Sequence, residues 1–382
     1  MRLLIPLTAS LLILPLAGAL LTGAPAARYL EFPPLTHYVV HAPFSWPIFL
    51  TLAIIILVVV LPFLIHVIRQ QSVERSNSPS PLLQSKIGNR QSAILPCGLL
   101  LVVIAWIFAW SRFPWFAPYQ LFTFSPLWLG YILVVNAWTH RRTGHCMLRD
   151  RPKNFLALFP ASAAFWWFFE YLNRFVQNWY YVGAGTLTSA EYFWFATLPF
   201  ATVLPAVLGT EELLASFPRA SAGLDHFRPL HLAHPRRWAS IWLALAILGL
   251  AGIGIWPDVL FPLLWVAPLI LITATQTLSG QPTLFTPIAS GNWQRLYRLA
   301  LAAFICGFFW ELWNFHSAAK WIYAIPYVNR FRLFEMPLLG FAGYLPFGLE
   351  CAVIGDAIAR LHITSTTLPL EPGRPRPGQE TQ

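Results

Sequence analysis

Charged residues are scarce in this chain of 382 residues: they make up only 10% of it, against 57% hydrophobic residues. An ordinary soluble domain has about 25% charged residues, so that class is excluded. Apolar runs of about 20 residues recur along the sequence, which is enough to span a bilayer. Runs such as 52–61 do not alternate apolar with polar residues as barrel strands do. The composition therefore predicts an all-α fold, a polytopic bundle of transmembrane helices.

The sequence also lacks the motifs of soluble enzymes and of metal sites. It contains no P-loop, no GxGxxG, no HExxH and no GxSxG. Its four cysteines show no CxxC spacing, and the histidines between 226 and 234 do not follow a metal-binding pattern. We therefore expect no metal and no cofactor.

The net charge of +10 does not require a nucleic-acid partner. Most arginines lie in short loops between apolar runs, the usual place of topology signals in membrane proteins. The expected partners are the lipid bilayer and a hydrophobic small molecule, with no nucleic acid. The oligomeric state is left open.

About ten spans follow from the apolar runs. They cover 3–22, 48–68, 93–110, 119–138, 155–173, 192–209, 238–255, 258–275, 297–316 and 335–360. The first is predicted as an uncleaved helix, with a signal peptide as the alternative. The predicted units are a helix pair (1–68), a cytoplasmic linker (69–92), a first transmembrane repeat (93–210), a cytoplasmic loop (211–237), a second transmembrane repeat (238–362) and a disordered tail (363–382).

Lysines and arginines are unevenly distributed between the loops. They are more frequent in 69–92, 139–154 and 210–237 than in most of the intervening loops, although the loop after 316 holds three. Cytoplasmic loops carry the excess of these residues. We therefore predict a multi-pass protein of the inner (plasma) membrane with both termini in the cytoplasm.

Two stretches of the chain spell nearly the same sequence. Glu170 and Glu311 lie 141 positions apart, each ends a long apolar run, and each is followed three residues later by an Asn. A Trp-x-Tyr element follows in both, at 179–181 and 321–323. A nearly constant offset indicates an internal duplication. With four spans in each copy, both copies cross the membrane in the same direction.

The repeated element places a carboxylate in an apolar run, where ionisable groups are costly and are usually functional. Glu335 is predicted to open the last helix close to Glu311, Glu350 lies deeper in that helix, and Pro346 is expected to kink it. We predict Glu311, Glu335 and Glu350 as acid/base groups. The predicted substrate-binding residues are Trp310, Trp313, Asn314, Lys320, Trp321 and Tyr323, with Glu170, Asn173, Trp179 and Tyr181 in the first copy.

These residue types also have structural roles. Trp and Tyr at the end of a span are ordinary interface anchors, and Glu and Asn hold helices together by hydrogen bonds. Lys320 is also suited to neutralising a nearby Glu. The two interpretations of the acidic and aromatic residues stay open at the level of sequence.

The second copy resembles the membrane-embedded lycopene cyclases and related carotenoid-modifying enzymes over about 300–350, with an echo at 165–205. The matching residues are Trp310-Glu311, Trp321-Ile322-Tyr323 and Glu335-Met336-Pro337-Leu338. The family pattern has paired acids after Pro-Leu, whereas this chain has Leu339-Gly340 there. The resemblance implies non-redox chemistry on a long isoprenoid that enters from the bilayer.

Three functions fit these observations. The first is an integral-membrane protein that acts on a hydrophobic isoprenoid or lipid by acid/base chemistry in an aromatic-lined cavity. The second is a transporter whose carboxylates bind protons or a solute. The third is a non-catalytic membrane scaffold.

Overall fold

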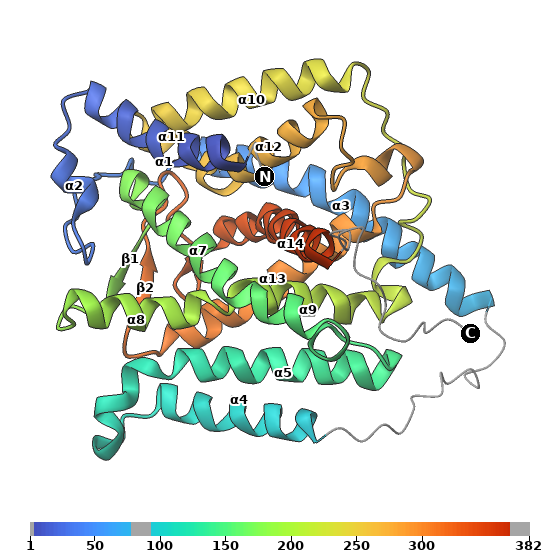
Figure 1. The fold of residues 1–382 in the computed structure, drawn as a ribbon, viewed down its shortest axis with the longest axis horizontal. Helices are drawn as coiled ribbons and strands as arrows, with labels where there is room; N and C mark the ends of the chain where they lie inside the picture. Colours follow the sequence, from blue (N-terminus) through green and yellow to red (C-terminus); the bar gives the residue numbers. More distant parts are fainter. Residues whose placement is uncertain (1–3, 78–92, 367–382) are drawn as a thin grey trace, which may run out of the picture.

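The computed structural model describes residues 4–77 and 93–366, and these are mostly helical (Figure 1). This confirms the predicted helical class. The longer helices are α1 (Leu4–Leu21), α3 (Trp46–Asn77), α4 (Ile94–Trp110), α5 (Phe124–Thr143), α7 (Pro152–Val176), α8 (Ser189–Phe200), α9 (Val203–Ala215), α10 (Pro235–Gly252), α12 (Pro262–Leu278), α13 (Gln294–Phe315) and α14 (Tyr344–Thr366). Shorter helices are α2 (Ala26–Leu30), α6 (Met147–Asp150) and α11 (Pro257–Leu260), and 3-10 turns are η1 (Pro114–Phe122), η2 (Pro218–Ser221), η3 (Thr286–Ser290) and η4 (Leu338–Gly343). Most of the predicted linker, from 78 to 92, and most of the predicted tail, from 367, lie outside the described residues.

Five helical segments of the described chain are long and apolar enough to cross a membrane, which makes this a membrane-spanning protein. They are Trp46–Val73, Pro152–Val176, Ser189–Ala215, Gln294–Phe315 and Leu338–Arg360. A sixth is formed if α4 and η1, which meet at 113°, count as one broken span. The predicted number of ten is not confirmed, although each predicted range contains helix. Three of the other predicted spans are too short or too polar to count. Helix α12 has only 17 residues. The last turn of α5 contains His140, Arg141 and Arg142, and the first turn of α10 contains Arg236 and Arg237.

The last predicted span does not begin as a helix. Glu335 lies in the turn between two short antiparallel strands, β3 (Arg332–Leu333) and β4 (Met336–Pro337). Phe334, the residue before it, has a φ of +57°, which no α-helix accommodates. Because α14 starts only at Tyr344, Pro346 falls in its first turn, where proline is tolerated. The predictions of a helix start at Glu335 and of a kink at Pro346 are therefore wrong.

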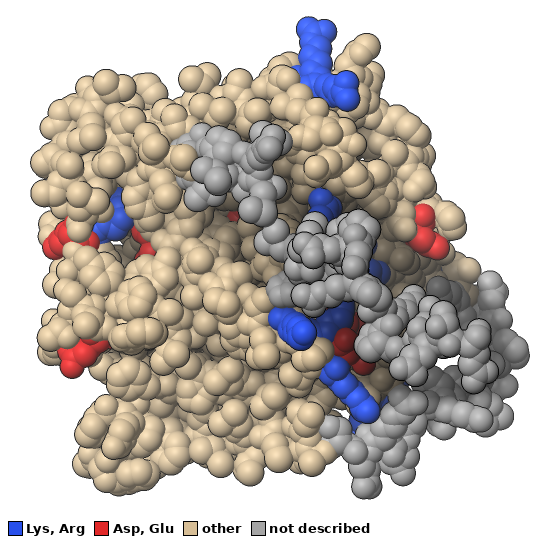
Figure 2. Space-filling view, viewed as in Figure 1, with Lys and Arg blue, Asp and Glu red and all other residues tan. Residues whose placement is uncertain are grey.

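The connections of the chain collect at two opposite ends of the helices. At one end Arg151 and Glu212 form an ion pair of 3.1 Å, and Arg298 and Glu211 form another of 3.0 Å. Blue side chains gather over this end of α5 and α9 in Figure 2. At the other end the backbone N–H of Ser45 donates to the carbonyl of Tyr327. These contacts bring together the loops to which the sequence assigned the same side.

The central helices are α7, α9, α13 and α14, and the pairs α4–α5 and α10–α12 pack outside them (Figure 1). The crossing of α13 and α14 is close: a Cβ added at Gly348 would lie 2.1 Å from the carbonyl oxygen of Leu299. Glycine at this position lets the two backbones approach, as small residues do between membrane helices. This tight pair fixes the position of Glu311 on α13 relative to Tyr344 on α14.

Candidate functional site

Two strands that follow α7 and α13 pair with each other and form one wall of the site. Strand β1 (Trp179–Val182) runs antiparallel to β2 (Lys320–Tyr323), so that Trp179 pairs with Tyr323 and Tyr181 with Trp321. The Trp of each strand therefore lies opposite the Tyr of the other. This two-stranded ribbon joins the two stretches that the sequence showed to be alike.

Each strand is held to its preceding helix by an asparagine. The Nδ2 of Asn173 donates to the carbonyl of Trp179 at 2.8 Å, and the Nδ2 of Asn314 donates to that of Trp321 at 2.8 Å. In each residue Oδ1 accepts a backbone N–H, from Asn178 at 2.9 Å and from Trp321 at 2.9 Å respectively. Both side chains are engaged with backbone, and neither lines the cavity described below.

Glu170 lies behind three aromatic side chains. Its Oε1 accepts hydrogen bonds from the indole N–H groups of Trp166 and Trp179, each at 3.1 Å, and from the hydroxyl of Tyr181. The Glu170 side chain is buried. One carboxyl oxygen thus orients three rings toward the same space.

Glu311 occupies the matching place on α13 and is fully buried. Its Oε1 accepts the hydroxyls of Tyr323 and Tyr344, each at 2.7 Å, and its Oε2 has no hydrogen-bond partner. Burial raises the pKa of the Tyr323 hydroxyl well above its usual value, and burial does the same for Tyr181. Both phenols on the ribbon therefore stay protonated and serve as donors to the carboxyl groups.

The sequence predicted that Glu335 approaches Glu311, and no hydrogen bond joins the two acids in the structure. Glu335 instead accepts a hydrogen bond from the Nζ of Lys320, and Arg332 lies 4.0 Å from its other oxygen. The reason is that the residues around Glu335 form a hairpin turn rather than the first turn of a helix. Lys320 neutralises a Glu, as the structural interpretation of this residue expected.

Glu350 is fully buried and shares no hydrogen-bond partner with Glu311 or Glu335. Its Oε1 accepts the backbone N–H of Leu269 on α12 at 3.2 Å, and its Oε2 has no partner. It is absent from the cavity wall, which reaches only Pro346 on the same helix. The structure therefore separates Glu350 from the aromatic site.

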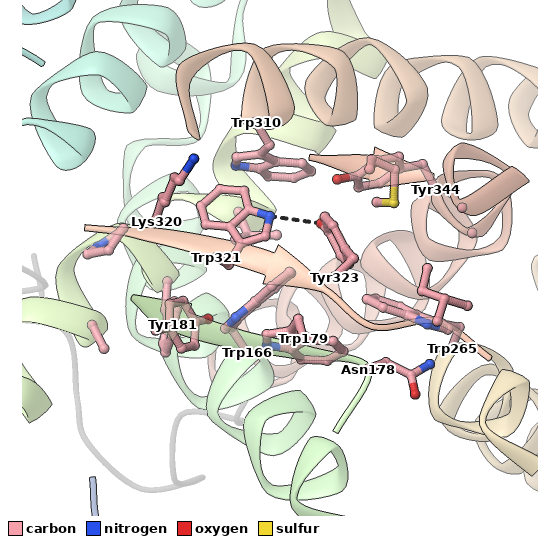
Figure 3. Close-up of a pocket in the computed structure, with 18 of the residues that line it drawn as sticks. Trp166, Asn178, Trp179, Tyr181, Trp265, Trp310, Lys320, Trp321, Tyr323 and Tyr344 are labelled. Carbon is pink, nitrogen blue, oxygen red and sulfur yellow. Dashed lines mark hydrogen bonds between the residues drawn. The ribbon is translucent and has the colours of Figure 1, made fainter. Parts of the chain in front are cut away.

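A cavity of about 300 Å³ lies against the ribbon, within the size range of sites for small molecules. Figure 3 shows the aromatic residues around it. The rings on its wall include Trp166, Trp179, Tyr181, Tyr192, Trp265, Trp310, Trp321, Tyr323 and Tyr344. Among Lys, Arg, His, Asp and Glu, Lys320 alone is on the described wall, and Asn178 and Ser125 are also on it. The carboxyl groups lie behind the rings rather than on the surface of the cavity.

Of the predicted binding residues, Trp310, Lys320, Trp321, Tyr323, Trp179 and Tyr181 line the cavity. Trp313 does not: it packs against Trp128 and Trp106, and its Nε1 has no partner. Sequence reasoning missed Trp166, although its place one helical turn before Glu170 is a signal that pointed to it. Tyr344 has no aromatic counterpart at the repeat offset, where Val203 stands, and Trp265 corresponds only to Phe124, outside the repeated motif, so neither was identified.

The arrangement suits an apolar ligand that carries or acquires positive charge. Aromatic faces attract cations, most strongly where water is excluded. Tyr hydroxyls that are bonded to a carboxyl group are also able to pass protons to and from a bound molecule. Within the described residues, no three His, Cys, Asp or Glu side chains gather where a metal ion is held.

Comparison with protein-family models, with curated proteins and with solved structures gave no match. The fold and the site therefore define the protein by its physical class. It is a helical membrane-spanning protein in which buried carboxyl groups support the aromatic wall of a cavity.

Proposed function

We propose that this protein is an integral-membrane enzyme that acts on a hydrophobic isoprenoid or lipid by acid/base chemistry without a redox change. The observation that carries the proposal is that two buried acids hold aromatic residues of the cavity wall by hydrogen bonds. Tyr323 and Tyr344 both line the cavity and both donate to Glu311. A non-catalytic scaffold requires neither a cavity nor buried acids that hydrogen-bond the residues of the cavity wall.

The chemistry requires a proton that can be given and taken back. A protonated Glu311 passes its proton through the Tyr323 or Tyr344 hydroxyl to a double bond of the substrate, which leaves a carbocation. The rings stabilise that cation by cation–π attraction. Loss of a proton from a neighbouring carbon to the same relay restores Glu311. The product is an isomerised or cyclised hydrocarbon with its redox state unchanged.

Duplication of one ancestral unit supports a cavity at the centre of the molecule. Asn173 and Asn314 each donate from Nδ2 to the carbonyl of the strand Trp, and the ribbon pairs the two Trp-x-Tyr elements. The pairing is centred on Tyr180 and Ile322, which are 142 positions apart, so the two strands are related by a local two-fold axis. Two copies with the same direction across the membrane then face each other over the cavity.

We infer that the protein lies in the plasma (inner) membrane of the cell and that both of its termini are in the cytoplasm.

Two features fit the resemblance to membrane-embedded lycopene cyclases. The acid in Trp310-Glu311 supports the wall, and Trp321 and Tyr323 stand on the wall and are hydrogen-bonded to each other at 2.9 Å (Figure 3). The paired acids after Pro-Leu are missing, and Glu335 is bound to Lys320. The proposal therefore rests on Glu311 and its tyrosines and does not specify cyclisation of lycopene.

The test compares two buried glutamates of the same chain. Glu311→Gln removes the acid behind the cavity, and Glu350→Gln removes a buried acid that is away from it. Membrane lipids of the host are extracted and profiled by mass spectrometry after expression of each form. We expect the isoprenoid or lipid species that change with the wild-type protein to return to the empty-vector level with Glu311→Gln and to persist with Glu350→Gln.

Other outcomes point to the remaining functions. Unchanged lipids together with altered solute uptake in Glu311→Gln indicate a transporter. Loss of both variants from the membrane indicates that the acids only hold helices together. Either result contradicts the enzymatic proposal.

A further inference from the structure

A groove between α4 and α5 lies apart from the cavity at the ribbon. The two helices run side by side at one edge of the molecule (Figure 1). The groove has a volume of about 340 Å³, and its wall is formed by Leu95, Leu99, Val134, Trp138, Arg141 and Arg142. None of these residues lines the cavity at the ribbon. Leu99 is 50% exposed and Trp138 is 46% exposed, so the groove opens to the surroundings of the helix pair.

The groove follows from the way the two helices pack. A Cβ added at Gly98 would lie 3.1 Å from the backbone nitrogen of Val134, so the two backbones come close together there. Leu95 and Leu99 share one face of α4, because residues four apart are neighbours on a helix. Val134 and Trp138 share a face of α5 for the same reason. These two apolar faces form the sides of the groove.

One end of the groove carries two positive charges. Arg141 and Arg142 lie in the last turn of α5, and Arg141 is exposed. Arg142 is held in place: its Nε donates to Ser216 Oγ and its Nη2 to the carbonyl of Ser216, each at 2.9 Å. Its guanidinium also lies 3.6 Å from the centre of the Phe217 ring. All of these partners are neutral, so they leave the charge uncompensated.

The acids near this end are bound elsewhere. Glu212 pairs with Arg151 at 3.1 Å, and Asp150 accepts the backbone N–H of Cys146 at 2.8 Å. Among the described residues, neither arginine of the groove forms an ion pair with an acid. The groove therefore combines apolar sides with a net positive end.

We propose that the α4–α5 groove binds one anionic phospholipid, with its phosphate at Arg141 and Arg142 and part of an acyl chain against Leu95, Leu99 and Val134. Arginine suits a phosphate because its N–H groups match the phosphate oxygens. Basic pockets between membrane helices on the cytoplasmic side are typical sites for anionic head groups. The orientation inferred above places the arginines on that side.

The apolar sides of the groove favour a lipid over a small soluble anion. They belong to helices at the membrane, where the available apolar ligand is an acyl chain. Two arginines without acidic partners favour a head group with a net negative charge. A zwitterionic lipid carries its own cation beside the phosphate and therefore gains less from them.

The experiment is native mass spectrometry of the purified full-length protein. The protein is titrated with phosphatidylglycerol and with phosphatidylcholine of the same acyl chains, and the bound fraction gives the affinity and the number of lipids. We expect one phosphatidylglycerol to bind at least about tenfold more tightly than phosphatidylcholine, since each arginine contributes about fivefold. An excess of inorganic phosphate should not displace the lipid, because phosphate has no acyl chain.

Two pairs of variants test the charge and the groove separately. Arg141→Ala should weaken phosphatidylglycerol binding about fivefold, whereas Arg237→Ala, at an exposed arginine in the first turn of α10, should leave it unchanged. Leu99→Trp should fill the groove and weaken binding at least about tenfold. Leu100→Trp adds the same bulk at a neighbouring position that is 60% exposed and not on the wall, and it should keep binding.

Four results overturn the inference, and none of them bears on the proposed function. Equal affinity for the two lipids shows that no anionic head group is selected. Equal losses in Arg141→Ala and Arg237→Ala, or in Leu99→Trp and Leu100→Trp, show that binding does not depend on this groove. Displacement by inorganic phosphate shows an ion site without a lipid. A dimer that Leu99→Trp dissociates shows that a second copy of the chain covers the groove.

Discussion

At the scale of single residues, the two asparagine clamps determine where the cavity wall stands. Asn173 and Asn314 each join the end of a central helix to the backbone of a strand by hydrogen bonds through both atoms of the carboxamide. Alanine at either position leaves buried backbone groups without partners, which costs roughly 1–3 kcal/mol for each group.

We predict that Asn173→Ala and Asn314→Ala each destabilise the protein by about 2–4 kcal/mol. The two losses should be similar because the clamps are alike. Thermal unfolding in detergent measures them, with Asn329→Ala as a control at an exposed position. A large loss at one clamp and none at the other would show that the two strands are not held in the same way.

Sequence reasoning reached the acids and the strand aromatics but not their arrangement. Glu170, Glu311 and the Trp-x-Tyr elements were found because an offset of 141 to 142 residues repeats them. Tyr344 and Trp265 escaped, since they reach the site only through the packing of α14 and α12 against α13 and α7. The sequence suggested that Lys320 neutralises a Glu but did not identify Glu335, because a hairpin turn stands where a helix was predicted.

At the scale of elements, the turn that leaves β1 is set by a glycine. Gly183 has a φ of +83°, and a Cβ there would lie 2.2 Å from the carbonyl oxygen of Ala318, the residue two before β2. A Cβ added at Gly185, two residues later, would have no atom within 4 Å. The close approach therefore belongs to the ribbon and not to the loop in general.

We predict that Gly183→Ala destabilises the protein by at least about 2 kcal/mol, through backbone strain together with the clash. Gly185→Ala should change the stability by less than about 0.5 kcal/mol. Thermal unfolding of Gly183→Ala and Gly185→Ala under the same conditions measures both losses. If the two variants are equally stable, the ribbon tolerates displacement from Ala318 and the prediction is wrong.

Helix α3 closes one side of the cavity. Leu52 and Ile56 are on the wall, whereas Leu57 is 51% exposed on the outer face of the same helix. Ring contacts hold α3 at its first residue, Trp46 against Phe331, and near its middle, Phe63 against Trp293. A larger residue between these two points is therefore able to fill the cavity without loosening either contact.

We predict that Leu52→Trp weakens ligand binding at least about tenfold by occupying the cavity, while Leu57→Trp leaves binding unchanged. Both additions are to a helix with an exposed face, so we expect stability to stay within about 1 kcal/mol of the wild type. Geranylgeraniol titration in nanodiscs checks the pair. Loss of binding in both variants would place the ligand outside the cavity.

At the scale of the whole molecule, the two similar stretches meet in the ribbon, and the cavity lies where they meet (Figure 1). The apolar composition and the long helices were readable from the sequence because each span is a local property. The cavity was not, because tertiary packing alone brings the residues of its wall together; they come from α3, α5, α7, α8, α9, α12, α13, α14, both ribbon strands and η4, among other segments.

The most direct test of the account is transfer of a solvent proton to a carbon of the substrate. Nanodiscs that carry the wild-type protein are incubated in D₂O with a lipid extract of host membranes, and the extract is then searched by mass spectrometry for carbon-bound deuterium. The account predicts that at least one isoprenoid or lipid gains deuterium with the wild type and with Glu350→Gln, and that Glu311→Gln slows the gain about 100-fold or more. Deuterium uptake that is absent from every lipid, or that proceeds equally with Glu311→Gln, would contradict it.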